Sequence, residues 1–382
     1  MSVQSKYTAM QAVYWMVYSV AFGFVTYYLL GTGIGEAAIG MVTASGGIIA
    51  AVLQPLTGSL TDSGRLRWKT ILVFLASLCL LFNILMIFIS SEVLNAVSYA
   101  GFITAVNLIV PVANGASFYY ERSGEKINFG FARGTGSLFY GAAAYVLGAV
   151  SVRAGIMSVP AAGALTSLFL ILILISMPCQ REVCEVRRQA GGSIISRYPG
   201  FFMVVAGCTL CLSFHSISCN FLIRIVESCG GDAEVMGTAI AVSAVFELPA
   251  MFGFSVIAKR FSAGMLLKVS AVFFIIKSLL FLFSSGVGMI YFTQMFQAGS
   301  FALMIPASVY YAESSMEKGD KMKGQAYMGL ALTAGSFIGA LSGGFLIQMA
   351  GLKQALILGT AFTVAGFMLI AAGTVNKKRE SK

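Results

Sequence analysis

Residues 69–90 read KTILVFLASLCLLFNILMIFIS and contain no charged side chain after Lys69. The hydrocarbon core of a bilayer is about 30 Å thick, so one helical span needs roughly 20 mostly apolar residues. The stretch therefore predicts a transmembrane helix. The whole chain of 382 residues is 58% hydrophobic and only 10% charged, with a mean hydropathy of +0.86. That composition excludes water as the main solvent of the fold.

Similar apolar runs recur along the chain, separated by charged residues or by glycine and proline, and they predict an all-α membrane protein of about twelve transmembrane helices. The first six are expected at residues 8–31, 37–60, 69–90, 93–118, 129–151 and 155–178. The second six are expected at residues 199–223, 234–257, 263–285, 288–312, 325–350 and 353–374. The first run is long enough to span, so we expect it to stay in the mature protein.

The longest polar stretch, CQREVCEVRRQAGGSIISRYP, lies between the two sets of predicted helices. It predicts two six-helix halves joined by a linker. The expected segments are an N-terminal half at 1–178, a cytoplasmic linker at 179–198, a C-terminal half at 199–375 and a basic cytoplasmic tail at 376–382.

The two halves echo each other in sequence. The segment QPLTGSLTDSGRLRWK contains Gly58, and the segment LPAMFGFSVIAKRFSAG contains Gly253, 195 residues later. Each segment has a proline, then a glycine near a predicted helix end, then basic residues. A repeat of half the chain length indicates a duplicated six-helix unit, with a binding site near the midplane between the halves.

The basic residues predict an orientation, because lysine and arginine resist translocation and collect in cytoplasmic loops. With both termini inside, 20 of them fall on the cytoplasmic side and only Arg153, Arg224 and Lys353 fall outside. We therefore expect a multi-pass protein of the bacterial inner membrane with cytoplasmic termini, surrounded by the lipid bilayer and acting as a monomer. The net charge of +10 is explained by these loop residues, so no nucleic-acid partner is expected.

No motif points to an enzyme, a metal or a cofactor. Cys208 and Cys211 have CxxC spacing, but both lie in the apolar run GFFMVVAGCTLCLSF, where cysteine behaves as a small apolar residue. The chain has one histidine and lacks HExxH, GxSxG and GxxxxGK[ST] elements. We therefore expect no catalytic site, no cofactor and no ATP-driven step.

The loop after the second predicted helix contains Gly58, Asp62, Gly64, Arg65 and Arg67. These residues resemble the Gly-x-x-x-Asp-x-x-Gly-Arg-x-Arg pattern of the major facilitator superfamily, except that Asp62 is one residue closer to Gly64 than in that pattern. The resemblance implies the major facilitator fold and a charge latch that opens as the halves rock. In such a latch the glycine lets helices pack closely and the aspartate caps a helix. Alternatively, these charges only fix the topology.

The segment NFGFARGTGSLFY, residues 128–140, resembles a pattern of the oligosaccharide:proton symporter and lactose permease-like branch. The resemblance implies that Arg133 hydrogen bonds the substrate and that Tyr140, two turns later, takes the place of a tryptophan that stacks on the sugar. A charge inside a membrane helix costs at least about 2.5–3.5 kcal/mol, which also favours a function for Arg133. The alternatives are that Arg133 reaches the membrane surface and that Tyr140 only packs.

Glu247 and Lys277 lie within the apolar runs AVSAVFELPAMFGF and VSAVFFIIKSLLFLF. The first run resembles the branch's Glu-x-Pro-x-Met-Phe element, and the branch carries a basic residue at the place of Lys277. Pairing lowers the cost of two buried charges in adjacent spans. The residues are either a proton-coupling pair, in which burial favours the protonated Glu247 and Lys277 favours its carboxylate, or a static ion pair.

Other polar residues complete the candidate substrate site. His215 and Asn220 lie in the seventh predicted helix, and Gln297 takes the position where the branch often has a histidine. The fourth predicted helix offers Asn107 and Asn114 where the lactose permease presents a carboxylate, a departure that weakens a galactoside assignment. His215 is either a packing residue, a substrate ligand or a proton carrier.

These residues lead to one functional expectation and one alternative. We expect a proton-coupled symporter of a small organic solute, with sugars or short oligosaccharides first and nucleosides or aromatic carboxylates next. The alternative is an uncoupled facilitator or an exporter on the same fold. In the eleventh predicted helix, Gly335, Gly339 and Gly343 form a GxxxG series that predicts close helix packing.

Overall fold

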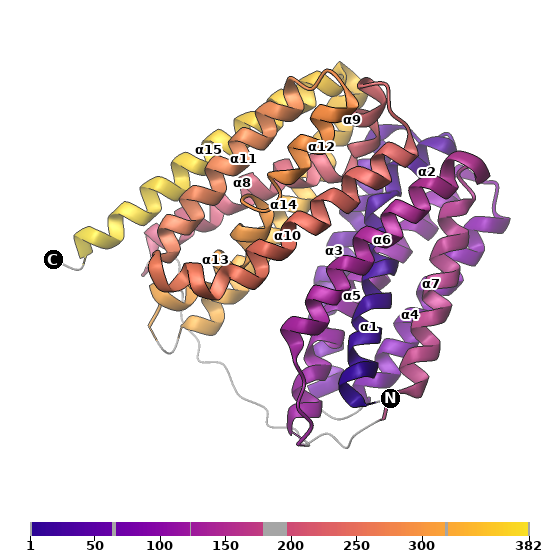
Figure 1. Cartoon of the computed structure of the whole chain (residues 1–382), viewed down its shortest axis with the longest axis horizontal. Coiled ribbons are helices and arrows are strands. Elements are labelled where there is room, and N and C mark those ends of the chain that lie inside the picture. The colour runs from indigo at the N-terminus through magenta and orange to yellow at the C-terminus, as the bar shows by residue number, and fades with distance from the viewer. Residues whose placement is uncertain (1, 63–65, 123, 179–196, 318–319, 381–382) are drawn as a thin grey trace. The chain divides into compact units, whose positions relative to one another are not determined.

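The computed structural model describes residues 2–62, 66–122, 124–178, 197–317 and 320–380, and within these ranges the regular elements are helices (Figure 1). The N-terminal elements are α1 (Val3–Tyr18), the π-helix η1 (Ser19–Gly23), α2 (Val25–Gly31), α3 (Glu36–Asp62), α4 (Trp68–Phe88), α5 (Glu92–Arg122), α6 (Phe129–Ala154) and α7 (Ser158–Ser176). The later elements are α8 (Pro199–Asn220), α9 (Leu222–Ser228), α10 (Ala233–Arg260), α11 (Ala263–Leu282), α12 (Val287–Met295), α13 (Phe301–Ser315), α14 (Lys321–Ala350) and α15 (Leu352–Glu380).

The all-α membrane fold is confirmed, although the number of continuous spans is smaller than predicted. Among the described residues, ten helices are long and apolar enough to cross a membrane, and an eleventh span counts if α1 with η1 and α2 form one segment bent by 49°. The predicted helix at 288–312 is broken between α12 and α13. Hydropathy averaged over a window cannot detect such a break.

Several backbone groups at the break between α12 and α13 have hydrogen-bond partners, as membrane depth requires. The Ser300 amide donates to Phe296 O at 3.0 Å, and the Ala302 amide donates to Gln297 O at 3.1 Å. From α11, the Ser270 hydroxyl donates to Ser300 O at 2.7 Å. Irregular backbone inside a span is tolerated only where protein groups replace the helical partners in this way.

The helices form two compact units. The first consists of Met1–Arg187 with Asp232–Ala241, and the second of Arg188–Gly231 with Val242–Lys382. In the first, α1 packs against α6 and α7, and α5 packs against α3 and α4. In the second, α8 packs against α14 and α15, and α11 against α13 and α15. The predicted linker at 179–198 lies almost wholly outside the described residues, and α15 continues to Glu380, beyond its predicted end.

The GxxxG series of α14 packs closely, as predicted. A Cβ placed on Gly339 would lie 2.2 Å from Ser213 O of α8, and one on Gly335 would lie 2.8 Å from Thr209 O. A Cβ on Gly343 would lie 3.1 Å from Ile217 Cγ1. Small residues therefore let α14 approach the backbone of α8, the arrangement that stabilises helix pairs in lipid.

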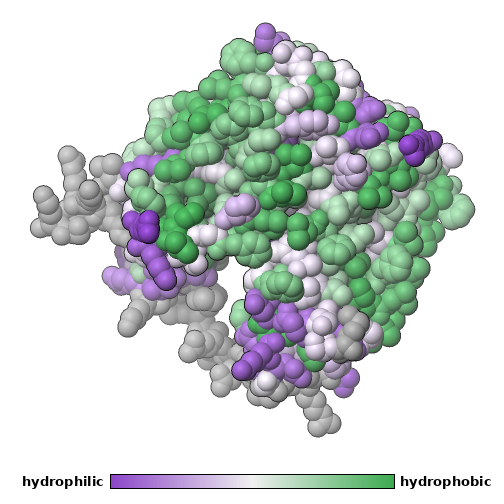
Figure 2. All heavy atoms as spheres, in the orientation of Figure 1, coloured by the Kyte–Doolittle hydropathy of each residue, from purple (hydrophilic) through white to green (hydrophobic). Residues whose placement is uncertain are grey.

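The surface is that of a protein solvated by lipid. Apolar side chains cover much of the face visible in Figure 2. Over the described residues, the large apolar side chains that are exposed include Phe88, Val52 and Met349. Continuous apolar surface on this scale would drive association in water. Exposure of such side chains is expected where the solvent is hydrocarbon.

Two lysines hydrogen bond the carbonyl groups at the C-terminal end of α7. Lys6 Nζ donates to Ser176 O at 2.6 Å, and Lys69 Nζ donates to Ile175 O and Met177 O at 2.8 and 2.6 Å. The last carbonyls of a helix lack intrahelical donors, and a cation there also interacts favourably with the helix dipole. Lysines from α1 and from the start of α4 thus join three helices of the first unit at one end.

Candidate functional site

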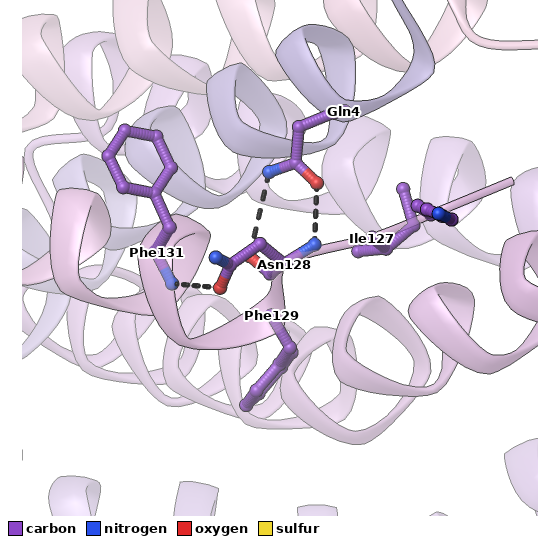
Figure 3. A pocket seen from close by; sticks show the side chains of 6 residues that line it. Gln4, Ile127, Asn128, Phe129 and Phe131 are labelled. Atoms are coloured by element: carbon purple, nitrogen blue, oxygen red, sulfur yellow. Dashed lines mark hydrogen bonds between the residues drawn. The ribbon is translucent and has the colours of Figure 1, made fainter.

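The start of α6 is fixed by the asparagine of the segment NFGFARGTGSLFY. Asn128 Oδ1 accepts the Phe131 amide at 2.9 Å and so caps the helix, while the Asn128 amide donates to Gln4 Oε1 at 2.7 Å (Figure 3). These groups line an open cavity of about 630 Å³ together with Lys126, Ile127 and Phe129. An N-cap satisfies an amide that the helix cannot satisfy itself. The two contacts fix the start of α6 beside α1.

Arg133 lies one turn into α6 and contacts α1. Its guanidinium carbon is 3.7 Å from the centroid of the Trp15 ring, and its Nη1 donates to Ser137 Oγ at 2.8 Å. A cation over an indole face is attracted by the negative ring face, more strongly where water is scarce. A Cβ on Gly136 would lie 2.4 Å from Trp15 Cδ1, so this glycine makes the approach possible.

Trp15 connects Arg133 to Asn114 of α5 through a buried glutamine. Trp15 Nε1 donates to Gln11 Oε1 at 3.2 Å, and Gln11 Nε2 donates to Asn114 Oδ1 at 3.2 Å. Gln11 also donates to the Tyr7 hydroxyl at 3.0 Å. Two predicted site residues, Arg133 and Asn114, are therefore joined by residues that the sequence analysis missed. A glutamine and a tryptophan in an apolar helix give only a weak signal, because neither carries a charge.

Aromatic rings of α1 extend this cluster toward Tyr140. The Tyr18 ring centroid lies 4.9 Å from that of Trp15, 4.4 Å from that of Phe22 and 6.3 Å from that of Tyr140. Trp15, Tyr18 and Tyr140 are each half-buried. We name the set Gln11, Trp15, Tyr18, Arg133 and Tyr140 the first-unit cluster. It offers flat apolar faces beside a guanidinium and an amide.

In the second unit, Gln297 joins the two charged residues that the sequence analysis paired. Lys277 Nζ donates to Gln297 Oε1 at 2.5 Å, and Gln297 Nε2 donates to Glu247 Oε1 at 2.9 Å. Lys277 and Gln297 are 2% and 4% exposed, and Glu247 is half-buried. The carbonyl end of the amide thus faces the cation and its NH₂ end faces the carboxylate. We call this arrangement the Lys277–Gln297–Glu247 bridge.

His215 lies beside the bridge. Its ring stacks on Phe301 with centroids 4.2 Å apart, and the ring Nε2 is 3.6 Å from Cys219 Sγ. Lys277 is close enough to both His215 and Cys219 for electrostatic interaction. The ring thus makes packing contacts, and a role of His215 as a substrate ligand or a proton carrier stays a prediction.

Asn220 takes part in helix packing. Its Nδ2 donates to Ser216 Oγ at 3.1 Å, and the Ser216 hydroxyl donates to Ser336 O of α14 at 2.8 Å. Asn220 is 7% exposed. These contacts join α8 to α14, and the predicted substrate contact of Asn220 stays a prediction.

The predicted latch is described only in part. A Cβ on Gly58 would meet no described atom within 4 Å, so the close helix packing expected there is not found. Gly58 instead lines a cavity of about 140 Å³ with Gly115 of α5. Arg67 precedes α4 and is exposed. The Asp62 side chain, Gly64 and Arg65 lie outside the described residues, so the latch stays a prediction.

We find no candidate metal site among the described residues. No group of three or more His, Cys, Asp or Glu residues there could hold a metal ion. Cys208 and Cys211 are buried, free thiols within α8.

Many long apolar helices with clusters of polar residues inside them define a class of protein, the integral multi-pass membrane proteins. The chain belongs to the MFS_1 like family, whose sequence profile matches residues 7–358. A comparison with curated protein sequences finds no match. The members of this family and the solved structures that the chain resembles are transporters, not enzymes.

Solved structures confirm the fold. A variant of the nucleoside transporter NupG is 15% identical over 98% of this chain and 99% of its own, with a TM-score of 0.84. A variant of the peptide transporter POT is 10% identical over 96% and 93%, with a TM-score of 0.79. A bacterial homologue of the human lysosomal transporter Spinster is 13% identical over 97% and 96%, with a TM-score of 0.70. At these identities the likeness concerns the fold alone.

Proposed function

We propose that this protein is a proton-coupled symporter of a small organic solute that works by alternating access. The observation that carries the proposal is the Lys277–Gln297–Glu247 bridge. A buried cation and a carboxylate are both expensive in a membrane, and a neutral amide that hydrogen bonds each lowers the cost of both. The half-buried Glu247 remains open to protonation, whereas Lys277 does not face solvent.

Protonation of Glu247 would change the bridge at one end. The neutral acid is a weaker acceptor than the carboxylate, so the hydrogen bond from Gln297 Nε2 would lose its charge assistance. Lys277 would then keep its bond to Gln297 Oε1 and its place 5.7 Å from the Phe281 ring centroid, but its charge would no longer be balanced by the Glu247 carboxylate. The two protonation states of Glu247 thus favour different arrangements of α10 relative to α11, and alternating access requires such a two-state element.

The first-unit cluster supports a solute that has both a flat face and polar groups. Arg133 supplies donors for hydroxyl, carbonyl or carboxylate oxygens, and the rings of Trp15, Tyr18 and Tyr140 supply stacking surfaces. Sugars, nucleosides and aromatic carboxylates all combine these features. We propose a hydroxylated ring compound, a sugar or a nucleoside, ahead of an aromatic carboxylate. Similarity in fold to a nucleoside transporter is consistent with the second of these.

A binding screen tests the solute class. Purified protein is melted with lactose, uridine, adenosine or 3-phenylpropionate, because a ligand that binds the folded state raises apparent stability. The solute that stabilises wild type is then followed by counterflow in proteoliposomes. We expect Arg133→Lys and Trp15→Ala to weaken counterflow, and the matched control Arg153→Lys, at an exposed site, to leave it unchanged. Equal counterflow in all four proteins would reject the first-unit cluster as the binding site.

The bridge also allows a second function, an uncoupled facilitator or exporter on the same fold. If Glu247 never changes its protonation, the bridge is only a static link between α10, α11 and the α12–α13 break. Counterflow that is identical at every pH and never becomes concentrative under a proton gradient would favour this function.

We further propose that the protein works as a monomer in a bacterial inner membrane, with the Gly58 to Arg67 loop as its cytoplasmic latch.

A further inference from the structure

The first span contains a π-helix where the aromatic cluster begins. Residues Ser19–Gly23 form η1 between α1 and α2, and the helix bends by 49° at this junction. A π-turn adds one residue to a helical turn and is frequent at functional sites. Ser19 Oγ is buried and has no hydrogen-bond partner among the described residues. A buried, unpaired hydroxyl costs free energy, so η1 needs compensation from its surroundings.

Tyr99 of α5 supplies that compensation. Its hydroxyl lies 3.2 Å from Val20 O and 3.1 Å from Ala21 O, both in η1. The side chain is fully buried, and its ring packs against those of Tyr28 and Phe102 at centroid distances of 5.7 and 5.9 Å. The hydroxyl is therefore held in place beside two carbonyl groups of η1.

The extra residue of η1 decides which faces the two parts of the span present. An α-helix turns through about 100° per residue, so one added residue rotates everything beyond it by about that angle. On the N-terminal side, Trp15 faces Arg133. On the C-terminal side, the Tyr28 hydroxyl donates to Met86 O and Asn95 Oδ1 at 3.2 and 3.1 Å. A continuous α-helix could not maintain both sets of contacts.

We infer that Tyr99 is a positioning residue for solute binding, because it holds η1 and thereby keeps Phe22 stacked on Tyr18. The inference rests on the proposed function, in which the Tyr18 ring stacks on the solute. Without the Tyr99 hydroxyl, η1 has lost the donor to Val20 O and Ala21 O and relaxes toward a regular helix. That relaxation turns Phe22 away from Tyr18. Tyr99 itself does not touch the solute.

The test compares Tyr99→Phe with Tyr28→Phe. Each variant loses one buried hydroxyl that donates to a main-chain carbonyl, but only Tyr99 bonds η1. Both are made in a Trp68→Phe background, because the chain has two tryptophans and Trp15 is then the only fluorophore of its kind. The readouts are Trp15 emission without solute, and KM and Vmax of counterflow for uridine and for lactose.

We expect Tyr99→Phe to shift Trp15 emission and to raise KM roughly tenfold, the size of effect that a lost aromatic contact has on binding, with little change in Vmax. Tyr28→Phe should match its parent in both readouts. Trp15 emission and KM that are equal in the two variants would overturn the inference. If Arg133→Lys and Trp15→Ala leave counterflow intact, the first-unit cluster is not the binding site and the proposed function fails. The Trp15 emission of Tyr99→Phe then still shows whether Tyr99 holds η1.

Discussion

Replacing Gln297 by leucine removes the amide of the Lys277–Gln297–Glu247 bridge while keeping a side chain of similar length. Two hydrogen bonds to charged groups are lost, at 2.5 Å from Lys277 and 2.9 Å to Glu247. Gln294, three residues earlier in α12, is 6% exposed against 4% for Gln297 and so provides a matched control. The comparison isolates the bridge from the general effect of a buried glutamine.

The size of the effect follows from the exposure of the two partners. A hydrogen bond to a charged group contributes about 1.5–3 kcal/mol, and the cost rises when the remaining partner stays buried. Lys277 is 2% exposed and cannot regain water, so the loss of its hydrogen bond costs the full free energy of that bond. Glu247 is half-buried and recovers part of its hydration. We therefore expect Gln297→Leu to cost about 2–4 kcal/mol of stability.

Thermal melting of the detergent-solubilised protein measures this cost. Gln297→Leu should melt several degrees below wild type, and Gln294→Leu should lose less. The bridge should also matter for transport, so Gln297→Leu should retain counterflow but lose concentrative uptake. A Gln297→Leu protein that melts with wild type would show that the bridge contributes no stability and would refute the reasoning from burial.

Two further predictions test the charges and the helix packing. Glu247→Gln combined with Lys277→Met should melt higher than Glu247→Gln alone, because Lys277 is 2% exposed and its buried charge would lack a carboxylate in the single variant. Melting temperatures that fall additively would contradict this. Gly339→Val should sharply reduce the yield of folded protein, because the added Cβ would lie 2.2 Å from a carbonyl oxygen of α8. Gly329→Val in the same helix is the control, and it should be tolerated because a Cβ there meets no described atom within 4 Å. Equal yields by size-exclusion chromatography would show that α14 and α8 can separate without loss.

The sequence identifies the residues whose charge is costly to bury in a membrane better than it identifies their partners. Arg133, Glu247 and Lys277 stand out because a charge in an apolar run carries a large cost. Gln11, Trp15 and the bridging role of Gln297 do not stand out, since amides and aromatic rings occur in membrane helices for many reasons. Which polar groups meet is decided by tertiary packing, which a single sequence does not specify.

The course of the helices was predictable only at the level of whole spans. Hydropathy located every long apolar segment, but it averages over windows that hide one-residue features. The π-helix at Ser19–Gly23 and the break after Met295 both escape such averaging. Each depends on a partner from a distant helix, Tyr99 for the first and Ser270 for the second.

Concentrative uptake under an imposed pH gradient tests the central claim most directly. Proteoliposomes with wild type or Glu247→Gln are given the solute found in the melting screen, at equal concentration on both sides. For one proton per neutral solute, the accumulation ratio in wild type should rise toward about tenfold per pH unit, because one unit is worth about 1.4 kcal/mol. The Glu247→Gln protein should exchange solute but hold the ratio at unity. A Glu247→Gln protein that accumulates solute as wild type does would contradict proton coupling through the bridge.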